Sequence, residues 1–421
     1  MRAGEYSRFA ALWLAVLGGC SGDTERSGPA STMRDSAGIR ILENFAPTLP
    51  AESAWTIASE PTLRIGTADG TSEQLLHRVA AALRLSDGRI VIANSPPPMV
   101  RWFSRDGRFL HGTGRPGGGP GEFGGGESAW IYTMWRLPGD SVATWEHSAR
   151  RMQVFDPEGR YARAVVLELP PDMHPLSYPQ ITGRFAGGFL AFLSPHFEPG
   201  PLGAVRRDSL EYVRYGGAGE YLGRIARLPG FERYTAEIER PGRGTSFLGE
   251  SGRPFGKPPL AFTDGQRFYY GSADRYEIEV RDPSGALRML IRRPDAGRAL
   301  TPDILDRYIA DRRAATPSDP AQQRALERYL DNAPFPDSLP AYRRFRVDTE
   351  GMLWVQEYDL PWDTVATWNV FDTGGRWLTN VDIPKRLSIL DIGADYILGV
   401  TRDELDVERV DVHALRRRIT P

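Results

Sequence analysis

The chain contains a single cysteine in 421 residues, which excludes a disulfide framework and the paired-cysteine motifs of zinc and redox sites. Its six histidines show no H-x-x-x-H or H-E-x-x-H spacing, and there is no P-loop, G-x-S-x-G elbow or EF-type aspartate loop. An excess of charge of one sign is also missing, since 52 Lys and Arg face 54 Asp and Glu, a net charge of -2. The sequence motifs therefore indicate no particular reaction, and the balanced charge predicts no nucleic-acid partner.

Long hydrophobic runs are rare, and the one that stands out covers residues 9–17, preceded by Arg2 and Arg8. This run has the length of a signal-peptide core and is too short to span a membrane, so residues 1–19 are predicted to be a signal peptide. The LGGC segment that ends at Cys20 resembles the bacterial lipobox, which implies cleavage before the cysteine and lipidation of its thiol. The alternatives are a plain signal peptide with an incidental cysteine, or a buried N-terminal helix.

The lipobox resemblance also implies a location. Bacterial lipoproteins carry several acyl chains on this cysteine, which is enough for stable anchoring to a membrane. Ser21 rather than Asp follows the cysteine, and in the enterobacterial sorting pattern this favours the outer membrane. Residues 20–38 are small and polar, so we expect them to form a flexible tether. The predicted location is the bacterial cell envelope, with the lipid as a membrane anchor.

Glycine (45) and proline (34) are abundant, which predicts many turns and few long helices. A unit of four short strands, joined in pairs by glycine turns, recurs along the chain. The copies cover residues 83–114, 134–166, 183–228, 260–291 and 343–381, of which the third is degenerate. Turns such as Asp87-Gly88 and Gly374-Gly375 can reach the positive φ that tight hairpins require. The first-turn glycines recur at intervals of about 40 to 50 residues, the blade period of a β-propeller.

A sixth unit over residues 387–415 lacks its fourth strand. The segment 61–79 has the form of a fourth strand plus a link, and it would complete the sixth unit from the other end of the chain. Such a closure removes the exposed strand edge that invites aggregation. The sequence therefore predicts an all-β fold over residues 39–421, a six-bladed β-propeller whose C-terminal blade is completed by an N-terminal strand.

Three segments carry a family resemblance: Ser86 to Asn94, Val154 to Arg160, and Gly114 to Phe123. With them the chain resembles the NHL-related six-bladed β-propeller lipoproteins of environmental bacteria over residues 60–416. The resemblance implies the fold and says nothing about chemistry.

The glycine-rich segment 112–123 begins with a G-x-G-x-x-G pattern. A phosphate cradle needs free amides and a following helix, whereas Pro116 and Pro120 remove two amides, Glu122 would repel an anion, and a strand is predicted next. We interpret the segment as a link between two blades, with Phe123 packed between them.

A helical insertion is predicted at about residues 298–335. Residues 301–314 have Thr301 as N-cap, Pro302 at the first helical position and an apolar face, and residues 320–332 form a second helical stretch. Two interpretations are open: a helical pair that packs on the rim, or a cap over the central channel.

Four long connecting segments all fall on the face of the propeller that carries the links between blades, so we expect binding there. They are residues 112–126, 194–208, 229–258 and 293–342. His147, which ends a second strand, is the first candidate. Equivalent positions and their neighbours complete the candidate ligand-binding face: Asn94, Glu146, Arg150, Asp274, Arg275, Glu357, Asp359, Trp362 and Asp403. A ring of acids and arginines could hold a small ligand or a cation, but solvated loop residues are the competing interpretation.

Two functions are consistent with these observations. The first is a non-catalytic, monomeric binding module at the cell envelope, with a protein, peptide or glycan as partner and with no metal or other cofactor. The second is an enzyme of the hydrolase, lactonase or lyase type with a divalent cation in the central channel, an analogy based on the fold alone.

Replacement of Cys20 by Ala is expected to release the protein from the membrane fraction, because the acylated thiol would be lost. Fractionation followed by immunoblotting measures this, with Ser27→Ala as a control that keeps the cysteine. Continued membrane association of the Cys20→Ala protein would refute lipidation at this residue.

Overall fold

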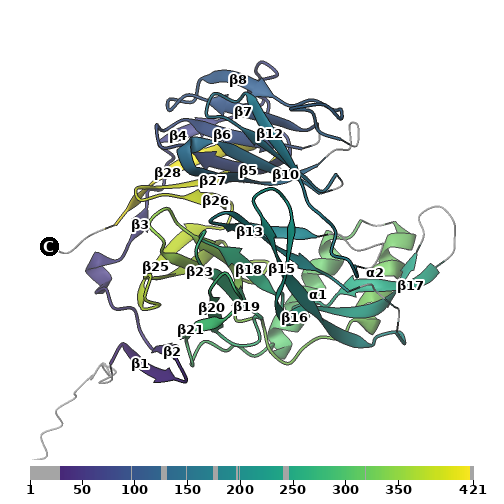
Figure 1. Cartoon of the computed structure of the whole chain (residues 1–421). Helices are drawn as coiled ribbons and strands as arrows, with labels where there is room; N and C mark the ends of the chain where they lie inside the picture. The colour runs from purple at the N-terminus through teal and green to yellow at the C-terminus, as the bar shows by residue number, and fades with distance from the viewer. Residues whose placement is uncertain are drawn as a thin grey trace, which may run out of the picture.

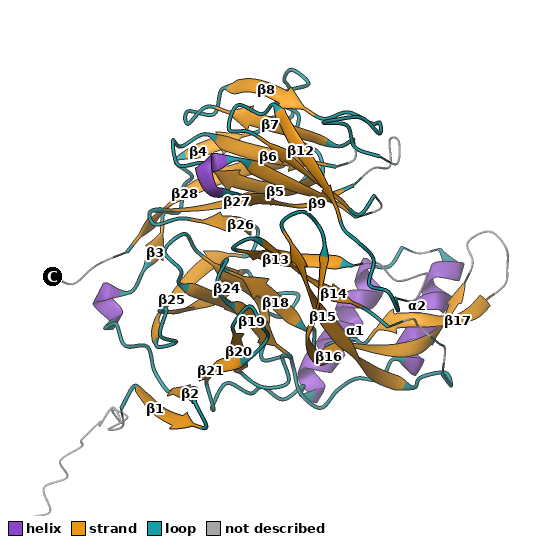
Figure 2. Cartoon of the chain, in the orientation of Figure 1, coloured by secondary structure: helices purple, strands orange, loops and turns teal. Residues whose placement is uncertain are grey.

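The computed structural model describes residues 29–417, except 96, 125–129, 148, 174–178, 196–197, 199, 240–245 and 318. Within these residues the chain is mostly β-strand, arranged in six sheets with two helices at one side (Figures 1 and 2). The predicted signal peptide, Cys20 and the first part of the predicted tether lie outside the described residues.

The six sheets follow one another along the chain, and we number them in that order. Sheets 1 to 3 contain the following strands: β5 (Val79–Arg84), β6 (Ile90–Asn94), β7 (Met99–Phe103) and β8 (Phe109–Thr113) in sheet 1; β9 (Ile131–Arg136), β10 (Val142–Glu146), β11 (Arg151–Phe155) and β12 (Tyr161–Val166) in sheet 2; β13 (Gln180–Phe185), β14 (Gly188–Leu193), β15 (Val205–Gly216), β16 (Tyr221–Glu239) and β17 (Ser246–Gly252) in sheet 3.

Sheets 4 to 6 continue the same antiparallel order. Their strands are β18 (Leu260–Thr263), β19 (Phe268–Gly271), β20 (Glu277–Arg281) and β21 (Leu287–Arg292) in sheet 4; β22 (Tyr342–Val347), β23 (Leu353–Glu357), β24 (Val365–Phe371) and β25 (Trp377–Pro384) in sheet 5; β26 (Ser388–Ile392), β27 (Tyr396–Arg402) and β28 (Glu408–Arg416) in sheet 6.

The Asp-x-x-Gly turns explain how the repeat makes hairpins. In the turn between β24 and β25, Asp372 Oδ1 accepts hydrogen bonds from the amides of Gly374 (2.9 Å) and Arg376 (2.8 Å). Gly375 has a φ of 86°, a region that a residue with a Cβ rarely adopts. The aspartate therefore holds the turn closed while the glycine supplies the backbone conformation.

Neighbouring sheets are held together by apolar clusters. One cluster joins sheets 1 and 2 through Trp102, Phe123 and Phe155, and others join each later pair in turn. A further cluster joins sheet 6 to sheet 1 through Leu398 and Phe103. Four-stranded meanders that pack face to face in succession are the architecture of a β-propeller.

The glycine-rich link lies where it was predicted to lie. Phe123 is fully buried in the cluster between sheets 1 and 2, and its amide donates to the Arg115 carbonyl at 2.8 Å. Gly114 has a φ of 103°, and a Cβ on it would stand 2.7 Å from the Phe123 ring. The glycines thus allow the link to turn tightly around a buried aromatic ring.

The N-terminal region differs from the expectation of a tether up to residue 38. β1 (Ser31–Ser36) and β2 (Ile39–Asn44) form a hairpin, and β2 runs parallel to β21 at the outer edge of sheet 4. The turn at Gly38, with a φ of 78°, allows the hairpin, and Leu42 is buried in the cluster between sheets 4 and 5. Polar composition alone did not reveal this pairing.

Two short strands then cross to sheet 6. β3 (Thr56–Ile57) and β4 (Leu63–Ile65) both pair antiparallel with β28. A 3-10 turn at Ala51–Ser53 precedes them, and another at Pro138–Asp140 lies in the β9–β10 turn. The segment that was predicted to supply a strand to the C-terminal unit therefore pairs with it.

Sheet 3 is the irregular one, as the degenerate repeat suggested. β15 and β16 are much longer than the other strands, and together with β17 they form a β-arm at one side of the molecule (Figure 1). The helices α1 (Pro302–Ala315) and α2 (Pro320–Asn332) match the predicted insertion, and the Thr301 side chain caps α1 by accepting from the Ile304 amide.

Candidate functional site

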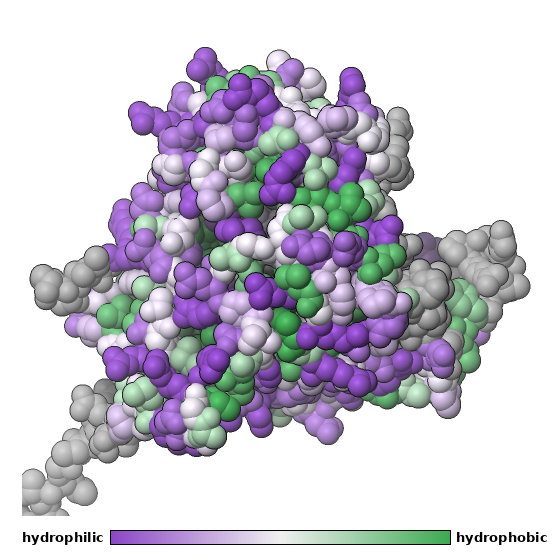
Figure 3. Space-filling view, in the orientation of Figure 1, coloured by the Kyte–Doolittle hydropathy of each residue, from purple (hydrophilic) through white to green (hydrophobic). Residues whose placement is uncertain are grey.

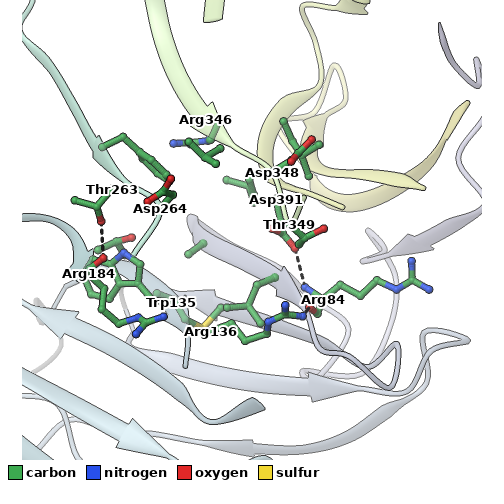
Figure 4. A pocket seen from close by; sticks show the side chains of 18 of the residues that line it. Arg84, Trp135, Arg136, Arg184, Thr263, Asp264, Arg346, Asp348, Thr349 and Asp391 are labelled. Carbon is green, nitrogen blue, oxygen red and sulfur yellow. Dashed lines mark hydrogen bonds between the residues drawn. The ribbon is translucent and has the colours of Figure 1, made fainter. Parts of the chain in front are cut away.

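The central cavity of the molecule is lined by the first strand of every sheet. It has a volume of about 390 Å³ and is bordered by residues of β5, β9, β13, β18, β22 and β26 (Figure 4). Since these strands come from all six sheets, the cavity occupies the position of the central channel of a propeller. A volume of this size suits a small molecule.

The cavity opens toward the short hairpins and not toward the links between sheets. Arg84 and Arg136 lie at the ends of β5 and β9, while Asp264 and Asp348 belong to the turns that follow β18 and β22. Binding was expected at the opposite face, which carries the links between sheets, and none of the ten residues predicted for that face lines this cavity. The predicted face stays a prediction.

Neither helix borders the cavity. The cavity lining includes no residue of α1 or α2, and α1 packs through Ile304 and Tyr308 on a cluster around Phe255 and Leu360. Figure 1 shows both helices beside β15, β16 and β17. Of the two interpretations left open for the insertion, the rim position therefore fits the described structure.

The charged groups of the cavity are unequally satisfied. Arg84 and Arg136 are held at the rim, because Arg84 lies over the Tyr396 ring at 4.7 Å and Arg136 Nη1 donates to the Arg84 carbonyl at 3.3 Å. Arg184 and Arg346 have no carboxylate partner within the described part of the chain. Burial lowers the pKa of both guanidinium groups, that of Arg346 to about 10. Both remain protonated at neutral pH.

Sequence reasoning missed these two arginines. Each sits in the first strand of a repeat unit between apolar residues, in the stretches GRF (183–185) and RRFRV (343–347). An arginine beside apolar residues in the first strand of a unit was the available signal, whereas the predicted candidates lie at or near the ends of the second strands.

Glu146 and Asn94 are scaffold residues. The Glu146 carboxylate is fully buried, accepts from the Gly124 amide at 2.9 Å and forms an ion pair with Arg151 at 3.0 Å. Arg151 also donates to the Glu122 carbonyl at 2.6 Å, so this pair fixes the glycine-rich link. Asn94 is likewise buried, and its Oδ1 accepts from Arg101 Nη1 at 2.6 Å.

His147 lies in an aromatic group at the link face. Its ring centroid is 5.2 Å from that of Tyr132, which in turn lies 6.4 Å from Trp130, and its Nε2 is 3.2 Å from Gln180 Nε2. Burial lowers the pKa of His147, so the imidazole is neutral at pH 7. Arg150 is partly buried nearby and has a φ of 49°.

Asp274, Arg275, Glu357 and Asp359 all form ion pairs on sheets 4 and 5. Asp274 accepts from Arg207 at 2.6 Å, and Arg275 pairs with Glu277 at 2.7 Å. Glu357 pairs with Arg293 at 2.6 Å. The buried Asp359 accepts from Lys385 at 2.7 Å. Asp274 and Arg275 are among the residues that line a second cavity, of about 350 Å³.

Trp362 and Asp403 are separate from these groups. The Arg307 guanidinium of α1 stacks on Trp362 at 4.3 Å from the ring centroid, which holds the helix against the sheet 5 loop. Asp403 accepts from the amides of Leu405 and Val407 and closes the turn between β27 and β28. The structure therefore distributes the ten predicted residues over several places and does not bring them into one site.

The described residues contain neither a cluster of metal-binding side chains nor a helix that could cross a membrane. No group of three or more His, Cys, Asp or Glu side chains there is placed to hold a metal ion. No helix among them combines the length and apolar character needed to cross a membrane. On the face that Figure 3 shows, hydrophobic residues lie in small groups separated by polar ones.

Comparison with known proteins gives likeness to structures but not to sequences. No protein-family model and no curated protein matches the chain. Similar solved structures include a putative exported protein from Bacteroides fragilis (11% identity, covering 89% of this chain and 98% of that one, TM-score 0.46) and a member of the duf4221 family from Bacteroides vulgatus (8%, 86% and 98%, 0.48). Virginiamycin B lyase from Staphylococcus aureus is a third (10%, 86% and 99%, 0.38). All three TM-scores lie below 0.5, so these similarities carry no argument about the function of this chain.

Replacement of Glu146 by Ala is expected to lower the free energy of unfolding by about 3–5 kcal/mol, because it leaves Arg151 buried without its partner. Denaturant unfolding measures the change. Glu158→Ala, at an exposed position of the same sheet, is the control and should change stability by no more than about 0.5 kcal/mol. Equal stability of the two variants would contradict the scaffold role of Glu146.

Proposed function

We propose that the chain is a lipid-anchored binding module of the bacterial cell envelope, monomeric, whose ligand binds in the central channel of a closed six-bladed propeller. The observation that carries this proposal is the cavity of about 390 Å³ at the meeting point of six first strands. Its arginines at positions 184 and 346 form no ion pair within the described residues, whereas the charged groups predicted at the link face mostly do.

Several contacts support closure of the ring. β4 pairs with β28, where Arg64 Nε and Nη2 donate to the two carboxylate oxygens of Asp411 at 2.8 and 3.0 Å. Ile65 belongs to the same apolar cluster that joins sheet 6 to sheet 1. A closed ring requires that a strand from the N-terminal part of the chain pairs with the C-terminal sheet and packs against sheet 1. β4 meets both requirements.

The location and the family belong to the same proposal. The envelope location rests on the signal-like segment 9–17 and on Cys20, which follows it. Membership of the NHL-related six-bladed lipoproteins rests on the repeat and on the link that ends at Phe123.

Closure can be tested with an engineered disulfide. Arg64 and Asp411 lie directly opposite one another, so Arg64→Cys combined with Asp411→Cys in a Cys20→Ala background is expected to oxidise to an intramolecular disulfide. Peptide mapping under non-reducing conditions detects it. Arg64→Cys with Arg163→Cys, which joins β4 to the distant β12, is the control that should stay reduced. Failure of the first pair to cross-link would count against closure.

Binding in the channel can be tested by filling it. Ala80 lines the cavity and belongs to no apolar cluster, so Ala80→Trp is expected to block the ligand without opening the core. Native mass spectrometry of the purified protein, after incubation with the small-molecule fraction of an envelope extract, should detect a bound molecule on the natural chain and not on the variant. Leu405→Trp introduces the same side chain at a position that is 83% exposed and should bind as the natural chain does. Equal binding by Ala80→Trp would refute a channel site.

A further inference from the structure

The lining of the central cavity carries charges of both signs. Its carboxylates accept hydrogen bonds from the scaffold, whereas two of its arginines, Arg184 and Arg346, form no ion pair within the described residues. Three carboxylates border the cavity, those of Asp264, Asp348 and Asp391. Asp348 Oδ1 accepts from the amides of Glu350 and Met352, both at 2.9 Å, and its Oδ2 accepts from Trp354 Nε1. Arg417 also forms an ion pair with this carboxylate at 2.7 Å, so the charge of Asp348 is compensated within the scaffold.

Asp264 is likewise paired with an arginine, whereas Asp391 accepts only from neutral donors. Asp264 Oδ1 accepts from the Arg267 amide at 2.7 Å, and its Oδ2 accepts from the guanidinium of the same residue at 2.7 Å. Asp391 Oδ2 accepts from the Arg84 amide at 3.1 Å and from the Tyr396 hydroxyl at 2.7 Å. All three acids therefore stabilise turns and contacts of the scaffold.

Arg346 forms no ion pair within the described residues, although the Asp391 carboxylate of the same cavity lies near enough to favour its charged form. Its Nε is buried and has no hydrogen-bond partner within the described residues, and its one recorded contact is a long bond of 3.4 Å from Nη2 to the Ile389 carbonyl. An enclosed cation with an unused donor costs free energy in the ligand-free protein. A second arginine on the same strand, Arg344, adds to the positive potential at this place.

Arg184 enters the cavity from β13, two sheets away from β22. The backbone carbonyl of Arg184 accepts from the Thr263 hydroxyl at 2.7 Å, which fixes the strand, but within the described residues its guanidinium makes no hydrogen bond or ion pair. Figure 4 shows Arg184 and Arg346 on the wall of one pocket, with Thr263 at the end of β18 and Asp264 in the turn that follows it between them. Two planar guanidinium groups thus border the same space.

From this juxtaposition we infer that the central cavity binds a small organic anion, which bears a carboxylate or phosphate group held by Arg184 and Arg346. This inference rests on the proposed function. Guanidinium groups bind both oxyanions through paired N–H donors, so the shared chemistry is recognition of a planar or tetrahedral oxyanion. Met134, Trp135 and Leu390 give the cavity an apolar wall, which favours an anion with an organic body over a bare inorganic ion.

The test uses the purified protein and isothermal titration calorimetry at low ionic strength, where screening is weak. The probes are citrate, glucose 6-phosphate, inorganic phosphate and glucose. We expect citrate or glucose 6-phosphate to bind, glucose not to bind, and added sodium chloride to weaken the binding. Arg184→Gln and Arg346→Gln are each expected to weaken it by about tenfold or more, since each removes a charged donor pair.

Two further variants separate binding from folding. Arg160→Gln removes an arginine of a distant hairpin whose side chain is 75% exposed, and it should change the affinity by no more than about twofold. Arg346→Met keeps an apolar stem and removes the enclosed charge, so the ligand-free protein should unfold at the same or a higher temperature while anion binding is lost. A lower unfolding temperature would indicate that Arg346 is a structural residue and would overturn its role here.

The remaining outcomes distinguish this inference from the proposed function. Binding of inorganic phosphate alone, unchanged by Arg184→Gln, would mean an adventitious ion only and would overturn the inference. If none of the anions binds, while Ala80→Trp still blocks the molecule taken from the envelope extract, the channel site stands and the ligand class is wrong. If none binds and Ala80→Trp has no effect, both proposals fail.

Discussion

Each sheet of this chain is apolar on both faces, and it must therefore be buried between two neighbours. β6 illustrates the constraint, because all five of its residues are buried and its four apolar residues alternate between two clusters. Val91 and Ala93 pack toward sheet 2, whereas Ile90 and Ile92 pack toward sheet 6. A strand with two apolar faces gains its burial energy only if sheets stand on both sides of it. The successive arrangement of the six sheets follows from this requirement.

The same constraint decides where a site can form. With both faces of the sheets used for packing, the free groups lie at strand edges, strand ends and turns. Most charged side chains at the link face are then needed to hold turns and links, as Glu146 and Arg151 hold the glycine-rich segment. The inner edges of the first strands have no partner strand, and it is there that Arg184 and Arg346 border a common space without a carboxylate of their own.

Much of the fold could be predicted from the sequence because its signals are local. Asp-Gly turns, alternation of apolar residues and the N-cap at Thr301 each act within a few residues, and the strands and helices follow from them. The pairing of β2 with β21 joins segments about 250 residues apart, and the exposed polar strand β1 shows no apolar alternation that would reveal it.

The candidate site was less predictable for a related reason. Whether an arginine such as Arg346 has a counter-ion depends on which strands of other sheets face it, and spacing along the chain does not contain that information. Glu146 and Asp359 were candidates for ligand binding because the sequence does not show that they form ion pairs with Arg151 and Lys385. Only the register of the strands identifies those acids as structural.

The β1–β2 hairpin has a mechanical consequence. A chain held at its N-terminus transmits any pull first to β1, which pairs antiparallel with β2. The load then reaches β2, whose residues Arg40 to Glu43 lie along Met289 to Arg292 in parallel register. Force along a strand in this geometry loads its ladder of hydrogen bonds together and not one after another. Sheet 4 therefore takes the load through this hairpin before any force reaches β4 and its pairing with β28.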